Sequence, residues 1–229
     1  DCDTDGDSDL PVELYVSGAH NQHDVTIGSI PQYNFFLAGN PYIKTISWDG
    51  ISKTNLSSVV SVWDDATSDW KTYNGIAGDL TNGLIAPFQG FWVQAIGGVG
   101  SFTIQTDDIA TSSASFMRSN NEDAIDYIRL SISDTNSFDE LFFTFDSLGS
   151  IQFDYKDALK FAPLLKSSRI AAMIISDGLP YKINNLPSHY GSEMTFPLQI
   201  LSLELDSSHN AVGITVSYTH LTLPTMIGV

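Results

Sequence analysis

Short runs in which apolar and polar residues alternate recur along most of the chain, and they predict β-strands. In Tyr127–Ser133, for example, every second residue is Ile or Leu, so one face of the strand would be apolar. The same period of two occurs in Glu13–Ser17, Asp24–Ile27, Asn34–Ala38, Val59–Trp63, Gly90–Ala95, Ser101–Gln105, Leu141–Asp146, Ile170–Ser176, Thr195–Ile200 and near Val212. Helical periodicity is nearly absent, so we expect helical turns only near Ser52–Leu56 and Lys156–Leu159.

Turn sequences separate these runs and indicate the fold class. They are Gly39-Asn40-Pro41, Asp49-Gly50, Asn74-Gly75, Asn82-Gly83, Gly97-Gly98 and Asp177-Gly178. Many short strands with frequent turns favour an all-β fold made of antiparallel, jelly-roll-like β-sandwich units. The polar stretch Thr111–Asp123 predicts a boundary between two such units, at residues 13–112 and 119–215, after an acidic linker at residues 1–12.

The last residues of the chain resemble a laboratory sequence. Val216–Thr225 matches the translation of a common transposase sequencing adapter, so we expect residues 216–229 to be foreign to the natural protein. The alternative is a genuine Thr-rich terminal strand. If the adapter interpretation holds, the natural chain is cut near Ile214 and the second β unit is truncated.

Charge excludes some classes of partner. The chain carries 10 Lys and Arg against 27 Asp and Glu, a formal charge of −17, which repels nucleic acid and anionic lipid but is compatible with divalent cations and neutral glycans. No run of about 18 apolar residues is present, so we expect no membrane insertion. Cys2 is the only cysteine and forms no internal disulfide, which does not by itself distinguish the cytosol from the exterior.

The first nine residues, DCDTDGDSD, suggest a calcium site. Alternating carboxylates offer hard oxygen ligands, and Gly6 permits a sharp bend between them. The residues that we expect to bind Ca²⁺ are Asp1, Asp3, Asp5, Asp7 and Asp9. An EF-hand would place Glu at its twelfth position, where Val12 stands, so the stretch is more similar to the acidic repeats of thrombospondin type 3 arrays. The alternative is a solvated acidic linker.

Four tryptophans allow a glycan-binding interpretation beside a purely structural one. Exposed aromatic rings can stack on sugars, but such rings more often pack in the core. Trp63 and Trp92 lie in strongly alternating strands, and we expect them in the core. Trp48 and Trp70 lie beside turns, so they are the candidates for an exposed ligand-binding surface.

The sequence contains no recognisable catalytic motif. It has no G-x-S-x-G nucleophile elbow and no Walker or dinucleotide-binding glycine pattern after a strand. Asp154 and Asp157 could be imagined as paired glycosidase carboxylates, but two acids three residues apart are common. We therefore expect a protein that is not an enzyme.

Several motifs occur in an order that resembles one family of exported proteins. They are Gly39-Asn40-Pro41-Tyr42, Ile46-Ser47-Trp48-Asp49, Val60-Ser61-Val62-Trp63-Asp64, Tyr73-Asn74, Ile85–Ala95 (IAPFQGFWVQA), Ile128-Arg129-Leu130, Phe153–Lys160 (FDYKDALK) and Ile183–Pro187 (INNLP). Over residues 15–214 this order is similar to the region that precedes the C-terminal sorting domain in type IX secretion cargo of Bacteroidota. Within the FDYKDALK motif, we expect Asp154, Asp157 and Lys160 to form a polar cluster that anchors a loop.

The resemblance implies an extracellular or outer-surface location and a role as stalk or adhesion module, with glycans or other surface proteins as partners. No catalytic residues come with it. The alternative is a glycan-binding accessory module of a secreted polysaccharide-degrading enzyme. A hydrolase is the third and weakest interpretation.

Overall fold

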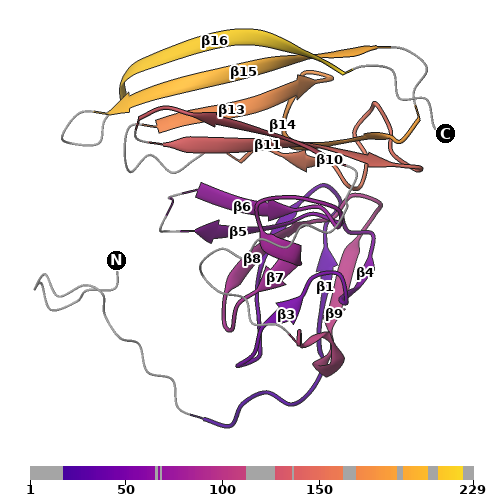
Figure 1. Cartoon of the computed structure of the whole chain (residues 1–229). Coiled ribbons are helices and arrows are strands. Elements are labelled where there is room, and N and C mark those ends of the chain that lie inside the picture. The colour runs from indigo at the N-terminus through magenta and orange to yellow at the C-terminus, as the bar shows by residue number, and fades with distance from the viewer. Residues whose placement is uncertain are drawn as a thin grey trace, which may run out of the picture.

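A computed structural model describes residues 18–64, 67, 69–111, 127–135, 137–161, 169–189, 193–205 and 211–223. The described chain is all-β, as the alternation predicts, and its helical content is two single 3₁₀ turns, η1 (Thr81–Gly83) and η2 (Thr106–Asp108). None of the helices in the described residues is long and apolar enough to cross a membrane. Strands β1–β9 and strands β10–β16 gather on opposite sides of the molecule (Figure 1), and no sheet contains strands of both groups.

The first group of strands forms a sandwich around one core. Its strands are β1 (Val25–Ile30), β2 (Phe35–Gly39), β3 (Ile46–Ser47), β4 (Ser52–Thr54), β5 (Val60–Asp64), β6 (Asp69–Tyr73), β7 (Leu84–Ile85), β8 (Gly90–Gln94) and β9 (Gly100–Ile104). They pair in the orders β1-β9-β4, β2-β8-β5-β6 and β3-β7. Alternate residues of β5 and β8, such as Val60, Val62, Phe91 and Val93, are buried in the shared core, as a half-buried strand requires.

The second group of strands forms one curled sheet. Its strands are β10 (Tyr127–Ser133), β11 (Phe138–Asp146), β12 (Ala158–Leu159), β13 (Arg169–Ser176), β14 (Leu179–Pro187), β15 (Met194–Leu205) and β16 (Ala211–Leu223). The order is β10-β11-β14-β13-β15-β16, with β12 paired to β14, and all pairs are antiparallel except β11 with β14. One apolar cluster joins Leu141 and Phe143 of β11 to Phe196 of β15 and Leu223 of β16, so the second group of strands has an apolar core of its own.

The two segments predicted as helical turns form short strands instead. Ser52–Thr54 forms strand β4 on the edge of β9, and Ala158–Leu159 forms strand β12 on β14. Both segments are short, and pairing with a neighbouring strand overrides their local preference. The alternation also missed β14, because its polar residues Lys182, Asn184 and Asn185 lie buried among apolar ones.

Residues 216–223, which we expect to be adapter-derived, continue strand β16. They pair with β15 from Leu201↔Val216 to Met194↔Leu223. A Thr- and Leu-rich segment of alternating pattern pairs with an open strand edge whatever its origin. The adapter interpretation therefore stays a prediction, and residues 224–229 lie outside the described residues.

Candidate functional site

The most unusual chemistry in the described residues lies where the two groups of strands meet. Strand β6 and the loop after it approach the sheet formed by β11 and β14 (Figure 1), and charged side chains are buried along this contact. We call seven charged residues along it the ionic junction, of which Lys71 is only partly buried: Asp69, Lys71, Asp79, Asp139, Lys160, Arg169 and Lys182.

Lys182 is the centre of the ionic junction. Only 1% of this residue is exposed, yet its ammonium group donates to Asp79 Oδ2 at 2.6 Å and to the carbonyl oxygen of Trp70 at 2.5 Å. Lys71 Nζ lies 3.8 Å from the same Asp79 oxygen. Burial alone would lower the pKa of Lys182, but the attraction of Asp79 and two further carboxylates outweighs it and raises that pKa. Lys182 is therefore a fixed positive charge that ties β14 to β6.

Two more buried pairs continue the junction. Arg169 at the start of β13 lies 3.3 Å from Asp69 in β6, and Lys160 donates to both carboxylate oxygens of Asp139 at 2.6 and 2.5 Å. Burial raises the pKa of Asp69, but Lys182, Lys160 and Arg169 together bring that pKa below its ordinary value. Burial and the neighbouring Lys182 lower the pKa of Lys160, and Asp139 and Asp69 oppose this shift. The Arg169–Asp69 pair thus joins the two groups of strands, whereas the Lys160–Asp139 pair lies within the second group.

Neutral hydrogen bonds join the same two groups of strands. Asn74 is fully buried, and its side-chain amide donates to Thr144 Oγ1 at 3.1 Å and to the carbonyl oxygen of Lys156 at 2.9 Å. Its side-chain oxygen accepts from the N–H groups of Ile76 and Ala77, which closes the turn predicted at Asn74-Gly75. This turn is thus an anchor between the two units as well as a connection.

The FDYKDALK motif forms a loop and the short strand β12, and both are held on β14. Asp157 accepts from the backbone N–H of Asn185 at 2.6 Å and from the Asn184 amide at 3.1 Å, while Asp154 accepts from the Asn185 amide at 3.0 Å. The expected polar cluster is therefore confirmed for Asp154 and Asp157. It is wrong for Lys160, which binds Asp139 instead. Burial raises the pKa of Asp157 to about 7, although these N–H donors oppose the rise.

Trp48 does not have the exposure that its place beside a turn suggested. It is 0% exposed, packs edge-to-face against Phe91 and Phe102, and donates from Nε1 to the carbonyl oxygen of Ser58. Gly83, with φ of 59°, leaves room for it, because a Cβ there would lie 3.1 Å from Trp48 Cβ. The expectation of an exposed Trp48 was wrong, because a residue before a turn can still point into the core. Trp48 is not available to stack on a ligand.

The other three tryptophans share one face of the β2-β8-β5-β6 sheet. The register places Trp63 opposite Trp70 and Trp92 opposite Ser61, so all three side chains point away from the first core, and all are partly exposed. The expectation that Trp63 and Trp92 lie in the core was therefore wrong, since the alternation puts them on the opposite face from Val62 and Val93. The ring centroid of Trp70 lies 5.2 Å from that of Trp63 and 5.3 Å from that of Phe161, and the ring planes are inclined at 69° and 58°.

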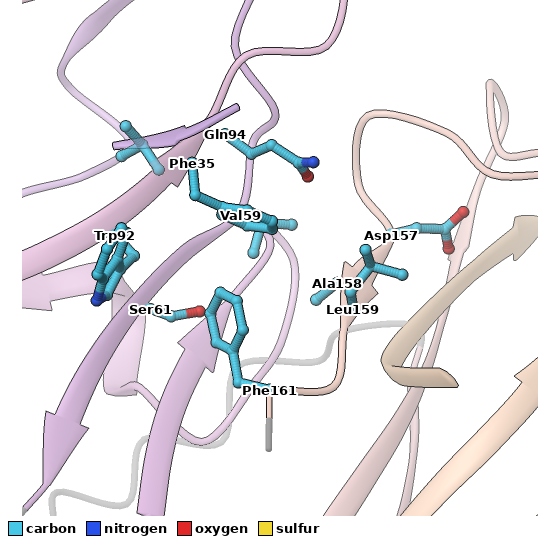
Figure 2. Close-up of a pocket in the computed structure, with 10 residues that line it drawn as sticks. Phe35, Val59, Ser61, Trp92, Gln94, Asp157, Ala158, Leu159 and Phe161 are labelled. Atoms are coloured by element: carbon cyan, nitrogen blue, oxygen red, sulfur yellow. The ribbon is translucent and has the colours of Figure 1, made fainter. Parts of the chain in front are cut away.

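Two hollows in the described part of the chain differ in size and enclosure. One has a volume of about 20 Å³, enough for a single water, and lies between Phe35 and Trp92 of the first unit and Ala158, Leu159 and Phe161 of the second (Figure 2). The other, of about 460 Å³, is open and borders the Asp177-Gly178 turn and the start of β15. Its one ionisable lining residue is Asp177.

The expected calcium ligands Asp1, Asp3, Asp5, Asp7 and Asp9 lie outside the described residues. Within the described residues, no group of three or more His, Cys, Asp or Glu side chains could hold a metal ion. The calcium hypothesis therefore depends on the first nine residues alone and stays a prediction.

Comparison of the chain with protein-family models, with curated proteins and with solved structures finds no match. The resemblance to type IX cargo consequently remains a hypothesis carried by the motifs themselves.

Proposed function

We propose that this chain is a non-catalytic β-sandwich region of a secreted or cell-surface bacterial protein, where it serves as a stiff stalk or adhesion segment. The observation that carries the proposal is the ionic junction. A rotation of one unit against the other would leave buried charges such as Lys182 and Arg169 without their partners, at a cost of about 3–5 kcal/mol for each broken pair. Contacts of this kind oppose the relative motion that is usual between linked domains.

The burial and hydrogen bonding of the charged groups support a structural role over a catalytic one. Lys182, Lys160 and Asp157 would be reactive groups in an accessible cleft, but each is buried and held by hydrogen bonds to neighbouring protein groups. The hollow between the units has room for about one water molecule, not for a substrate. We infer that these groups fix geometry instead of performing chemistry.

A distance distribution across the junction tests the stiffness. Spin labels at Ser52→Cys in β4 and Ser133→Cys in β10, both exposed positions, in a Cys2→Ser background should give one narrow distribution. The same pair in a Lys182→Met chain should give a broader one, because the central ion pair is lost. A broad distribution in the chain with Lys182 intact would refute the stiff-segment proposal.

The cell-surface part of the proposal rests on the motif resemblance and is tested at the source locus. A long-read sequence through the locus should continue past Ile214 into further β-strand and a sorting domain, without residues 216–229. If VSYTHLTLPTMIGV is genomic and a stop codon follows it, the export assignment loses its support.

A glycan-binding accessory role is the second candidate, favoured by the shared face of Trp63, Trp70 and Trp92. The tilted packing of Trp63, Trp70 and Phe161 is less suitable for a flat sugar ring than coplanar rings would be. Trp70→Ala and Trp92→Ala should each weaken retention on a polysaccharide panel, whereas Phe88→Ala, at an exposed aromatic in the turn before β8, should not. Retention that is absent, or equal in all variants, would remove this candidate.

A further inference from the structure

Strand β2 is an open sheet edge with an unusual composition. It lies at the end of the β2-β8-β5-β6 sheet and pairs only with β8 in the described residues. Phe35, Phe36 and Leu37 are 40%, 36% and 54% exposed in succession. From residue 32 to residue 40 the sequence QYNFFLAGN carries no charge and no proline. Natural proteins usually protect such an edge, because it is a template for pairing with another strand.

The other edge strands of the two larger sheets in the first unit, β1, β4 and β6, are protected. Strand β1 is interrupted by an irregularity between Ile27 and Ile30, where Ser29 has φ of 63°. Strand β4 has three residues, one of them Lys53. Beside β6, the following loop covers the edge, since Leu80 N–H donates to Thr72 and Thr72 N–H donates to Asp79. Among the edge strands of the β1-β9-β4 and β2-β8-β5-β6 sheets, β2 is therefore the one without such protection in the described residues.

The backbone groups of β2 that point to the open side can be assigned from its pairing. Asn34 accepts from Ala95 N–H, and Asn40 N–H donates to Gln89, so the even-numbered residues direct their backbone groups to β8. In an antiparallel ladder this direction alternates, so Phe35, Leu37 and Gly39 direct their N–H and C=O groups outward. The described residues give these groups no partner.

We propose that the open edge of β2 pairs antiparallel with β2 of a second copy of this chain, about a two-fold axis at Leu37. This register opposes Phe35 to Gly39 and Phe36 to Ala38, so each phenylalanine faces a small residue, and it opposes Leu37 to its own copy as an apolar pair. The outward groups of the three odd-numbered residues then complete hydrogen bonds in both copies. No charge lies in the paired segment, so the −17 net charge of each copy opposes the pairing only from a distance.

Sedimentation of the full chain tests the proposal directly. A five-residue strand pair is at the small end of specific interfaces, so we expect a dimer with Kd on the order of 10 µM. The dimer should tighten between 50 and 500 mM NaCl, because salt screens the repulsion between two acidic copies. A chain that stays monomeric up to about 200 µM at high salt would overturn the proposal and leave the edge to another occupant.

Charge variants test the two-fold axis. Leu37→Lys places a like charge opposite itself and should raise Kd at least about ten-fold, and Leu37→Glu should do the same. An equimolar mixture of the two variants should recover a dimer, because Lys then faces Glu. Leu148→Lys, at a residue that is 74% exposed and distant in sequence, is the matched control and should dimerise as the parent chain does.

Two results would contradict the proposed register. Dimerisation of Leu37→Lys at the parent Kd would show that another surface is used, and a mixture of the Lys and Glu variants that fails to pair would exclude an axis at Leu37. Amide exchange gives an independent check. The N–H groups of Phe35, Leu37 and Gly39 should gain protection with rising concentration, whereas those of Phe36 and Ala38 should be protected throughout. The proposal is independent of the stalk or adhesion role, so either can fail without the other.

Discussion

Replacing Lys182 by Met removes the charge at the centre of the ionic junction while keeping most of the side-chain volume. The change breaks the 2.6 Å contact with Asp79 and removes the donor to the Trp70 carbonyl oxygen. Removing one partner of a buried ion pair costs about 3–5 kcal/mol. Lys71 remains 3.8 Å from Asp79, and Thr72 N–H still donates to it, so the lower end applies and we expect a loss of about 3 kcal/mol in unfolding free energy.

A double-mutant cycle with Asp79 separates the energy of the ion pair from the loss of side-chain packing at Lys182. Asp79→Asn removes the carboxylate that Lys182 contacts directly and leaves only the more distant charges of Asp69 and Asp139, so it should also cost about 3 kcal/mol. Combining the two changes leaves a neutral pair in which Asn can still accept from Thr72 N–H, so the double variant should lose about 2 kcal/mol less than the sum of the singles.

Urea unfolding followed by circular dichroism measures these free energies, and Lys182→Met should also lower Tm by about 6–12 °C. Additive single effects, or a loss below about 1 kcal/mol for Lys182→Met, would refute the claim that this pair holds the units together.

Three further predictions concern other parts of the chain. The pKa of Asp157 is about 7 in the folded chain and about 3.8 in the unfolded chain, so the unfolding free energy should fall by about 3–4 kcal/mol as pH rises from 4 to 7. Urea titrations at several pH values should show a shallower fall for Asp157→Asn. An unchanged slope in that variant would contradict the assignment. Gly83→Ala should cost about 2–3 kcal/mol, since φ is 59° and the new Cβ would lie 2.6 Å from Tyr73 Cδ1, while Gly18→Ala, with no atom within 4 Å, should change thermal stability little. Millimolar Ca²⁺ should raise Tm if residues 1–9 bind it, and Asp3→Ala with Asp5→Ala should abolish the rise; a melting curve that ignores calcium in the parent chain removes that site.

The alternation along the chain was sufficient to predict the fold class and most long strands, because burial of one sheet face imposes a period of two. The same alternation also indicates to which face of the sheet the tryptophan side chains point. In Val60-Ser61-Val62-Trp63, parity places Trp63 with Ser61 and away from the valines, as the register shows. Judging exposure from nearness to a turn was less reliable, and Trp48 is the residue for which it failed.

The ionic junction was beyond prediction from local pattern. Lys182 lies in the run Tyr-Lys-Ile-Asn-Asn-Leu, where a lysine in a strand would ordinarily be solvated. Its partner Asp79 is 103 residues away, and Asp69 and Arg169 are separated by 100. Pairings at such separations depend on the packing of two sheets, which no local period encodes. A lysine set between Tyr181 and Ile183 was the one available signal.

The central claim is that the two groups of strands behave as one stiff block, and a single unfolding experiment tests it most directly. All four tryptophans, at positions 48, 63, 70 and 92, belong to the first unit, so their fluorescence reports the unfolding of that unit, whereas circular dichroism reports both. We predict that the two signals follow one coincident transition in urea. If fluorescence and circular dichroism instead gave separate midpoints, the units would unfold independently, and the account of a locked junction would be contradicted.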